Sequence, residues 1–240
     1  MRNLAALLLL SLAACSGGPR LNDRQRAFLG AAAEPSAVIA AELAFARMAR
    51  EKGTWTAFRE YATDDAVWPS PGWVNVKVDL KGAPDPAQAI VWSPDRVWSS
   101  CDGSFALSTG PATYPNGRRT RFATIWQRQD NGQYRWVLDQ GFDLEAGYAA
   151  PEMIAAEVAE CGERPDRLRR GPPPRARRGL AWQAGDSDDG TLSWTTELAP
   201  DCSRRLTVRA RRDGVPTEVF RAASPPPQVP AGGTAPRCAA

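Results

Sequence analysis

The chain has 240 residues, of which 43% are hydrophobic, and it carries 30 Lys and Arg against 27 Asp and Glu. This length and apolar content suit one or two small domains with a real core. Histidine is absent, which excludes a His-dependent catalytic triad and a His-ligated metal site.

The first fourteen residues have the pattern of an export signal. Arg2 is their only charge, and a small, apolar run follows from Leu4 to Ala14. A positive start followed by a short apolar segment is typical of a signal peptide. The run is shorter than the ~20 apolar residues that a membrane-spanning helix needs. Residues 1–14 are therefore predicted to be a signal peptide.

The signal ends in Leu12-Ala13-Ala14, and Cys15 and Ser16 follow it. This segment resembles the bacterial lipobox, which implies that Cys15 takes a diacylglycerol and anchors the chain in a membrane. Each buried methylene of such an anchor contributes ~0.8 kcal/mol. The residue after the cysteine is Ser16 and not Asp. By resemblance to enterobacterial lipoproteins, this residue implies sorting to the outer membrane. We expect a lipid-anchored protein on the periplasmic face of the cell envelope, more at the outer than at the inner membrane. The alternative is an ordinary secretory signal with a chance cysteine.

Four cysteines remain once Cys15 is set aside: Cys101, Cys161, Cys202 and Cys238. An even number in an exported chain predicts two disulfides, with three possible connectivities. The pairing of Cys101 with Cys161 and of Cys202 with Cys238 is favoured, because it keeps each bridge local. The chain has no C-x-x-C, which argues against a thioredoxin-type site or a zinc knuckle.

Residues 15–33 are small, polar and basic, as in a tether. Residues 35–52 are good helix formers, and Gly53 is expected to end the helix. Thr54 is expected to cap a second short helix that extends through Tyr61. One face of the first helix is apolar; it carries Val38, Ala41, Phe45 and Met48.

Strand signals follow the helices. The expected strands are 66–68, 73–78, 91–100 with an interruption at Pro94, 104–109, 121–129 and 133–142. Asn131-Gly132 between two alternating runs predicts a hairpin. Residues 151–161 are expected to form another short helix. Helices followed by successive antiparallel strands indicate an α+β fold.

A family resemblance rests on three segments of residues 34–144. They are ELAFARMAREKGTWTAFREYATDDAVW, WSPDRVWSSCDGSFALSTG and RFATIWQRQDNGQYRWVLDQG. These segments resemble the nuclear transport factor 2-like superfamily, in its SnoaL-like bacterial branch. The resemblance implies that residues 34–161 form a cone, in which a curved antiparallel sheet wraps around the helices and encloses a cavity. Such cones host isomerases, cyclases, dehydratases and non-catalytic binding modules, so the fold alone does not settle the function.

Asp139 is the candidate catalytic residue, because it lies at the end of the last strand of the cone. An apolar, Trp-lined mouth would raise the pKa of its carboxyl toward a value useful for acid/base catalysis. Strand alternation places Asp139 on the face opposite to Trp136. The structural alternative is that Asp139 caps the sheet edge or pairs with Arg121 or Arg128.

Seven of the nine tryptophans lie within the cone, which is more than packing requires. Large aromatics usually fill cores, but some could line a pocket for an apolar ligand. The pocket candidates are Trp55, Tyr61, Trp68, Trp92, Trp98, Trp126 and Trp136.

No metal or cofactor is expected. The acidic pair Asp64-Asp65 lacks a third acid at metal-loop spacing. The run Asp186–Gly190 lacks the ligand spacing of a calcium loop and is better interpreted as a turn.

The last third of the chain divides into three parts. Residues 162–179 form an Arg- and Pro-rich linker, either a plain charged spacer or a site for anionic lipid, lipopolysaccharide or peptidoglycan groups. Residues 180–223 are predicted to form a small β segment, with strands at 191–198, 204–211 and 218–222. Residues 224–240 are expected to be a disordered tail. Export argues against a nucleic-acid partner.

Two functions fit these features. The first is a non-catalytic envelope lipoprotein whose cone binds a small apolar ligand or a protein. The second is a cofactor-free acid/base enzyme, isomerase-like or cyclase-like, in which Asp139 works with Tyr61 or Tyr134. The missing histidine and the lack of a second obvious acid favour the first.

Overall fold

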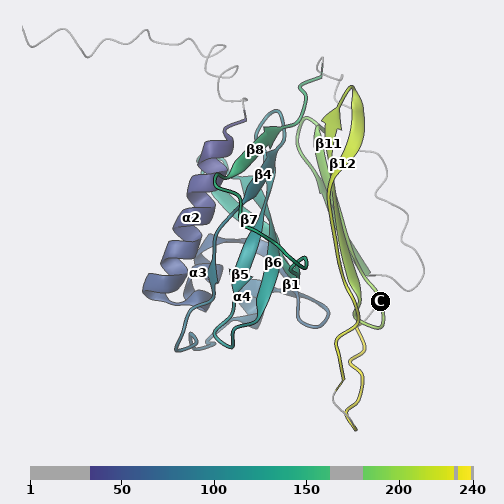
Figure 1. Cartoon of the computed structure of the whole chain (residues 1–240). Coiled ribbons are helices and arrows are strands. Elements are labelled where there is room, and N and C mark those ends of the chain that lie inside the picture. Colours follow the sequence, from purple (N-terminus) through teal and green to yellow (C-terminus); the bar gives the residue numbers. More distant parts are fainter. Residues whose placement is uncertain (1–32, 163–180, 230–231, 239–240) are drawn as a thin grey trace, which may run out of the picture. The chain divides into compact units, whose positions relative to one another are not determined.

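The computed structural model describes residues 33–162, 181–229 and 232–238. Two helices come first, α2 (Pro35–Lys52) and α3 (Thr54–Tyr61) (Figure 1). The first sheet follows, with β1 (Ala62–Pro69), β2 (Trp73–Asn75), β3 (Val91–Trp92), β4 (Arg96–Ser99), β5 (Phe105–Thr113), β6 (Arg119–Arg128), β7 (Tyr134–Asp143) and β8 (Ala155–Val158), and the short helix α4 (Val76–Asp79) after β2. The second sheet contains β9 (Ala181–Asp186), β10 (Leu192–Leu198), β11 (Arg204–Arg212) and β12 (Val215–Ser224).

The expected α+β class is confirmed. The first sheet has the order β2-β1-β7-β6-β5-β4-β8, and β3 pairs with β5. The predicted hairpin at Asn131-Gly132 joins β6 to β7. The sheet is mixed rather than fully antiparallel, because β1 pairs in parallel with β7 and β8 pairs in parallel with β4. These two parallel pairs join residues far apart in the sequence, which local turn signals cannot predict.

Two expected elements are wrong. Residues 151–161 contain strand β8 instead of a helix, because pairing with β4 satisfies their backbone groups and overrides helix propensity. The strand expected at 73–78 ends at Asn75, whose side-chain oxygen accepts a hydrogen bond from the Val78 N–H at 3.1 Å. That cap starts α4 in the middle of the expected strand.

The N-terminus of α3 is capped by a residue distant in sequence. Thr54 was expected to be the N-cap, but the cap position belongs to Gly53, which has a φ of 110°. The Asp85 carboxylate accepts from the Trp55 and Thr56 N–H groups at 2.5 and 3.0 Å. A Cβ on Gly53 would stand 2.2 Å from that carboxyl. Gly53 therefore permits both the left-handed backbone and the approach of Asp85.

The first sheet has a core on each of its faces. On the inner face, α2 and α3 pack around Phe45, Trp126 and Trp136. On the outer face, side chains such as Leu107 and Ile125 pack in one cluster with Leu192, Trp194, Leu206 and Val208 of the second sheet. The small β segment is therefore part of a shared hydrophobic core.

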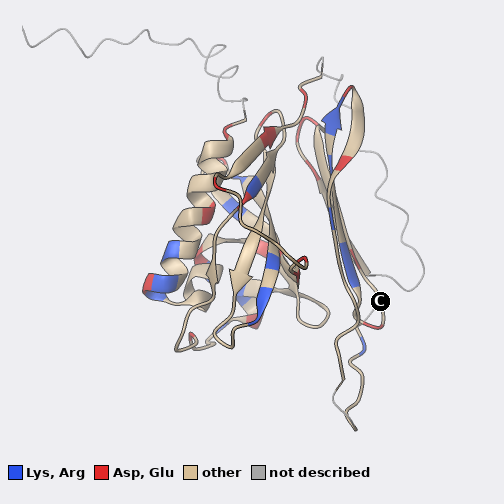
Figure 2. Cartoon of the chain, in the orientation of Figure 1, with Lys and Arg blue, Asp and Glu red and all other residues tan. Residues whose placement is uncertain are grey.

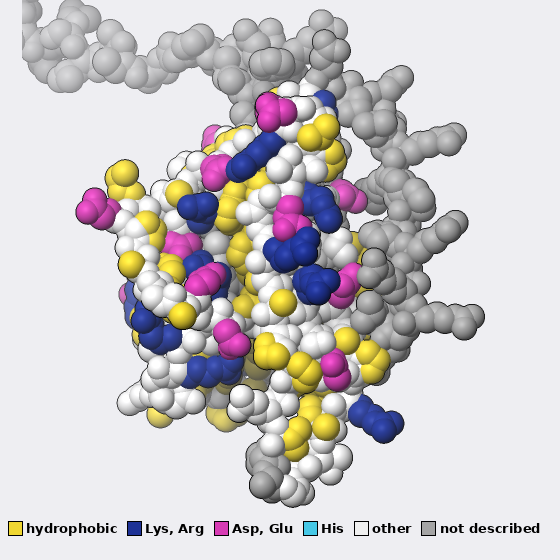
Figure 3. All heavy atoms as spheres, turned by 45° about the vertical axis from the view of Figure 1, so that its right-hand side comes forward, with side chains coloured by type: hydrophobic (Ala, Val, Ile, Leu, Met, Phe, Trp, Pro, Cys, Tyr) yellow, Lys and Arg dark blue, Asp and Glu magenta, His cyan; other side chains and the backbone are white. Residues whose placement is uncertain are grey.

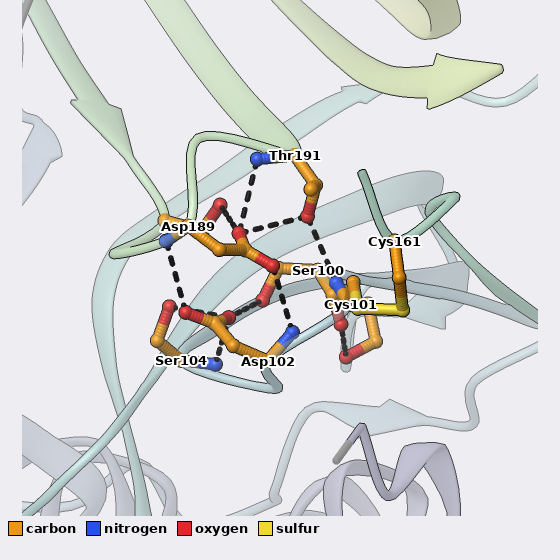
Figure 4. Close-up of a disulfide and its surroundings, with 9 residues drawn as sticks. Ser100, Cys101, Asp102, Ser104, Cys161, Asp189 and Thr191 are labelled. Carbon is orange, nitrogen blue, oxygen red and sulfur yellow. Dashed lines mark hydrogen bonds between the residues drawn. A yellow bond between two sulfur atoms is a disulfide. The ribbon is translucent and has the colours of Figure 1, made fainter. Parts of the chain in front are cut away.

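Two turns lock the sheets together at one end (Figure 4). The Asp102 N–H donates to Asp189 at 2.9 Å, and the Asp189 N–H donates to Asp102 at 3.0 Å. The Cys101 N–H donates to the Thr191 hydroxyl at 2.9 Å. We call these paired turns, residues 100–104 and 187–191, the aspartate clasp. The second turn confirms the turn expected here, although Asp186 itself is the last residue of β9.

Both favoured disulfides are confirmed. Cys101 is joined to Cys161 beside the aspartate clasp, and Cys202 is joined to Cys238. Cys202 and Cys238 are buried with Leu198, and Trp73 packs against them. The described residues of the tail, 225–229 and 232–238, contain no helix or strand. Cys238 nevertheless holds the end of this tail against the fold.

Charged side chains mark the ends of some elements (Figure 2). Arg50 and Lys52 occupy the last turn of α2, where cations interact favourably with the helix dipole. Among the described residues, none of the helices combines the length and the apolar character that a membrane crossing requires.

Candidate functional site

A row of polar residues crosses the inner face of the first sheet. Ser108, Thr124 and Asp139 occupy directly paired positions on β5, β6 and β7. Ser108 and Thr124 are completely buried. With Glu42 of α2, which contacts Ser108, they form what we call the polar row. Polar groups in a core are costly unless they are hydrogen bonded, and each member of this row has a partner.

Asp139 is the member of the polar row that solvent reaches. Its Oδ2 accepts a hydrogen bond from the Thr124 hydroxyl at 2.7 Å. Burial raises the pKa of Asp139 to about 7, the Thr124 hydrogen bond opposes this rise and the charge of Glu42 adds to it. The residue still keeps part of its surface exposed. Asp139 is therefore a carboxyl on the inner face that is mostly, but not completely, enclosed by the protein.

A β-bulge corrects the expected orientation of Asp139. Ile125 pairs with Leu138 and Trp126 pairs with Trp136, which leaves Val137 as the extra residue of β7. Val137 and Leu138 both pack on the outer core. Asp139 therefore shares the inner face with Trp136, opposite to what strict alternation predicted.

Glu42 is the functional candidate that the sequence analysis missed. It is fully buried, and it accepts hydrogen bonds from Trp92 at 2.7 Å, from the Ser108 hydroxyl at 2.5 Å and from Trp126 at 3.1 Å. Burial raises its pKa, and these three hydrogen bonds lower it. Its position three residues before Phe45 and four after Val38 places it in the apolar stripe of α2. A lone acid within such a stripe was the available signal.

Neither Arg121 nor Arg128, the expected arginine partners, forms an ion pair with Asp139. Arg121 lies on the outer face, where it pairs with Asp95 at 3.1 Å and with Glu145 at 2.9 Å. No ion pair joins Asp139 to Arg128 among the described residues. Asp139 is held by a hydroxyl rather than by a cation, and this arrangement leaves the rise in its pKa unopposed by positive charge.

Tyr61 and Tyr134, the expected tyrosine partners of Asp139, make no hydrogen bond to it and have other contacts. The Tyr134 hydroxyl donates to the Gly103 carbonyl at 2.6 Å. Tyr61 packs on Phe45, with ring centroids 5.2 Å apart. Burial raises the pKa of both tyrosines. Tyr114 is the tyrosine that lies close enough for the charge of Asp139 to raise its pKa, after burial as the larger cause.

The aromatic pocket candidates divide into three groups. Trp92, Trp126 and Trp136 are buried in the inner core, where the first two bond Glu42. Trp55, Tyr61 and Trp68 are half-buried at the edge of that core. Trp98 lies on the outer face instead, where its ring centroid is 6.1 Å from that of Phe220. Three buried indole rings thus occupy much of the inner core.

Trp98 lines a cavity of about 450 Å³ between β4 and β12. Its wall also carries Arg96 and Arg221, each paired on the surface with a glutamate. The face of the molecule in Figure 3 mixes side chains of both charges with apolar ones. On the face shown in that view, basic and acidic side chains are interspersed and form no broad patch of one sign.

The acidic residues considered as metal ligands have other partners. Asp64 pairs with Lys77 at 2.6 Å, and Asp65 accepts from the Thr63 hydroxyl at 2.7 Å. Within residues 33–162, 181–229 and 232–238, no group of three acidic or cysteine side chains is arranged to hold a metal ion.

Comparisons with known proteins give one structural similarity. No protein-family model matches the chain, and no curated protein matches it. Among solved structures, the chain is similar to a protein from Parabacteroides distasonis described as a "putative ketosteroid isomerase". That match has 16% sequence identity and a TM-score of 0.34, and it covers 43% of this chain and 86% of that chain.

Proposed function

We propose that the polar row is a proton-transfer site, and that the domain catalyses acid/base chemistry on a small, largely apolar molecule. The observation that carries this proposal is Asp139, a deeply set but partly exposed carboxyl whose pKa is raised to about 7. A general acid/base works best when its pKa lies near the operating pH. This is the enzymatic function, which the sequence alone favoured less than simple binding.

The chemistry follows from the two states of one carboxyl. Near neutral pH both the ionised and the protonated form of Asp139 are populated, and the ionised form can accept a proton from a bound molecule. The protonated form can return that proton at another atom, as an isomerisation requires. The Thr124 hydroxyl fixes Oδ2, so Oδ1 is the oxygen that is free to meet the ligand. Glu42 lies behind Ser108 and biases Asp139 through its charge.

Proton transfer can be measured without knowing the natural substrate. An aryl ketone such as 3-benzoylpropionate is incubated with the protein in D₂O, and deuterium entering beside the carbonyl is followed by NMR. Asp139→Asn should lower the exchange rate at least ~100-fold, because general-base catalysis is lost. Asp130→Asn, an exposed acid in the hairpin turn, is the matched control and should exchange at the unmodified rate.

The outcome separates catalysis from binding. Exchange that exceeds the buffer rate and depends on Asp139 supports the enzymatic proposal. Exchange equal in the unmodified protein and in Asp139→Asn would overturn it. The second candidate, a non-catalytic binding domain for a small apolar ligand or a protein, is supported by the packing of Trp92, Trp126 and Trp136 inside the cone. That candidate predicts ligand binding with no exchange above buffer.

We propose that this domain lies in the cell envelope, anchored through lipid on Cys15. Cys15 and the residues 164–178 of the Arg-rich linker lie outside the described residues. The two disulfides support export, because such bonds persist in oxidising compartments. Cys15→Ala should be released from membranes or accumulate as the uncleaved precursor. A variant that is still processed and membrane-bound would contradict lipidation.

An anionic envelope polymer is proposed as partner of the linker at residues 162–179, on the basis of the seven arginines within residues 164–178. Replacing these arginines by glutamine should reduce pelleting of the protein with purified peptidoglycan or lipopolysaccharide. Unchanged pelleting would identify the segment as a spacer.

A further inference from the structure

The cavity lined by Trp98 lies on the outer face of the first sheet, opposite to Asp139. We call it the outer cavity. Its volume is about 450 Å³, within the range of roughly 300–1,000 Å³ that small-molecule sites have. One wall consists of side chains that point outward from three adjacent strands: Arg96 on β4, Thr109 directly opposite it on β5, and Arg121 on β6.

Two further segments line the outer cavity. The loop after β7 contributes Tyr148, Ala149 and Pro151, and β12 contributes Val219 and Phe220. Trp98 is 5% exposed and packs on Phe220, with ring centroids 6.1 Å apart. The lining therefore combines apolar and aromatic side chains with a small number of charged ones, which is the composition of many ligand pockets.

The most buried charges of the outer cavity form a network of their own. Arg121 donates to Asp95 at 3.1 Å and to Glu145 at 2.9 Å, and the Tyr148 hydroxyl donates to the same Asp95 at 2.8 Å. The side chains of Arg121 and Asp95 are only 12% and 11% exposed. These bonds hold the loop after β7 on the sheet, so the cavity is shaped before a ligand arrives. Two carboxylates share one guanidinium, which leaves this network with a net negative charge.

Arg96 differs from the other two arginines that line the outer cavity. Those two each have a carboxylate at hydrogen-bonding distance. The nearest carboxylate to Arg96 within the described residues is that of Glu157, at 4.0 Å, and Glu157 has a closer partner in Arg212. The Arg96 guanidinium lies 5.4 Å from the Trp98 ring centroid. Stacking on the indole thus orients a half-exposed cation that retains hydrogen-bond donors for a ligand.

We propose that the outer cavity binds a small aromatic carboxylic acid, with the carboxylate on Arg96 and the ring beside Val219 and Phe220. A guanidinium matches a carboxylate with two parallel hydrogen bonds, and an aromatic ring adds contacts with the apolar part of the lining. The negative charge of the buried network disfavours a dianion such as a phosphate monoester, whereas a single carboxylate is matched by the one loosely paired cation. This site lies on the other face of the sheet from the proposed proton transfer and does not depend on it.

The test compares 2-naphthoate with the neutral 2-naphthamide, which has the same ring and nearly the same size. Binding to the full chain is measured by calorimetry. We expect the acid to bind at least ~10-fold more tightly than the amide, because hydrogen bonds between charged groups are the stronger ones. Arg96→Gln should lower the affinity for the acid to that for the amide and leave the affinity for the amide unchanged.

Arg205→Gln is the matched control. The Arg205 side chain is 53% exposed and lies 4.0 Å from Glu197, whereas that of Arg96 is 50% exposed and lies 4.0 Å from Glu157. Arg205 does not line the outer cavity, so its replacement should leave both affinities unchanged. Phe220→Leu should weaken the acid and the amide alike, because the ring contact is lost. Thermal unfolding of each variant shows that the comparison is made on folded protein.

Indole resonances locate the bound ligand. Trp98 lines the outer cavity, whereas Trp136 lies in the inner core. In protein labelled with ¹⁵N-tryptophan, 2-naphthoate should shift the indole N–H signal of Trp98, which is assigned with Trp98→Phe, and leave that of Trp136 in place. Asp139→Asn should bind the acid as tightly as the unmodified protein does.

The results distinguish this proposal from the proton-transfer proposal. Equal affinities for acid and amide, no binding of either up to millimolar concentration, or an equal loss in Arg96→Gln and Arg205→Gln would each overturn the outer site. A shift of the Trp136 signal without one of Trp98 would also overturn it, because the ligand would then lie on the inner face. Preferential binding of the acid in a protein without Asp139-dependent exchange would remove the enzymatic proposal and leave the outer site standing.

Discussion

The two faces of the first sheet differ at neighbouring residues of the same strands. Leu107, Ile125 and Leu138 point to the outer face and pack against the second sheet. Ser108, Thr124 and Asp139, each next to one of them, point to the inner face and form the polar row. At these outer positions the side chains are apolar and contribute to stability, whereas the neighbouring inner positions carry buried polar groups, which are costly unless they are hydrogen bonded. Because successive side chains of a strand point to opposite faces, neighbouring residues of one sheet contribute to the outer core and to the polar row.

The largest expected effect is a loss of stability from the outer face. Leu107→Ala should lower the free energy of unfolding by about 3 kcal/mol, because Leu107 is fully buried between the sheets. Ser108→Ala, one residue along, should cost about 1 kcal/mol through lost hydrogen bonds to Glu42 and Trp126. Urea unfolding of both variants measures this contrast, and equal losses would contradict the division between the faces.

The second effect concerns pH. The pKa of Asp139 is higher in the folded protein than in the unfolded chain, so the folded state binds more protons between about pH 4 and pH 7. Asp139 therefore makes stability fall as pH rises through that window. Asp139→Asn should remove this loss and be more stable than the unmodified protein at pH 8, by on the order of 2 kcal/mol. Unfolding curves at pH 4 and pH 8, with Asp130→Asn as control, test the sign.

The third effect concerns the aspartate clasp that joins the sheets. Asp189→Ala removes the acceptor of the Asp102 N–H, of the Thr191 N–H and hydroxyl and of the Ser187 hydroxyl. We expect a loss of about 1–2 kcal/mol in unfolding free energy. Asp188→Ala is the matched control, since the Asp188 side chain is exposed. An equal effect of both variants would show that the clasp contributes little.

The smallest effects are two opposite shifts within the polar row. Thr124→Val removes a hydrogen bond that lowers the pKa of Asp139, so this pKa should rise. Glu42→Gln removes a charge that raises the same pKa, so it should fall. Carboxyl ¹³C NMR titration of Asp139 measures both. Shifts in the same direction would contradict the coupling of Glu42 to Asp139 across the row.

The sequence predicted the elements whose signals are local. Asn131-Gly132 fixed the β6–β7 hairpin, and the position of Asp139 near the end of that hairpin identified it as a candidate. Apolar periodicity predicted α2 within a residue. These features depend on turn chemistry and side-chain period, which a short segment carries by itself.

What the sequence did not predict depends on distant partners. Strand β8 forms because β4 is available for parallel pairing. The bulge at Val137 follows from the register of β6 and turns Asp139 to the inner face. Glu42 becomes part of the site only because Ser108, Trp92 and Trp126 meet it from the sheet. Each of these is a tertiary effect. Only Glu42 had a local signal, a lone acid within the apolar stripe of α2, and that signal does not identify its partners on the sheet.

The edge strands of the two sheets determine whether copies of this protein can pair with one another at high local concentration. An open strand edge offers unpaired backbone groups to a second molecule and promotes aggregation. The first sheet ends in β2 and β8, which have only three and four residues. The long outer strand β12 of the second sheet carries Pro216 and a bulge at Val219, and the charged pair Glu218 and Arg221 follows its course. These three edge strands therefore offer neighbouring copies of the protein little that is suited to mutual pairing.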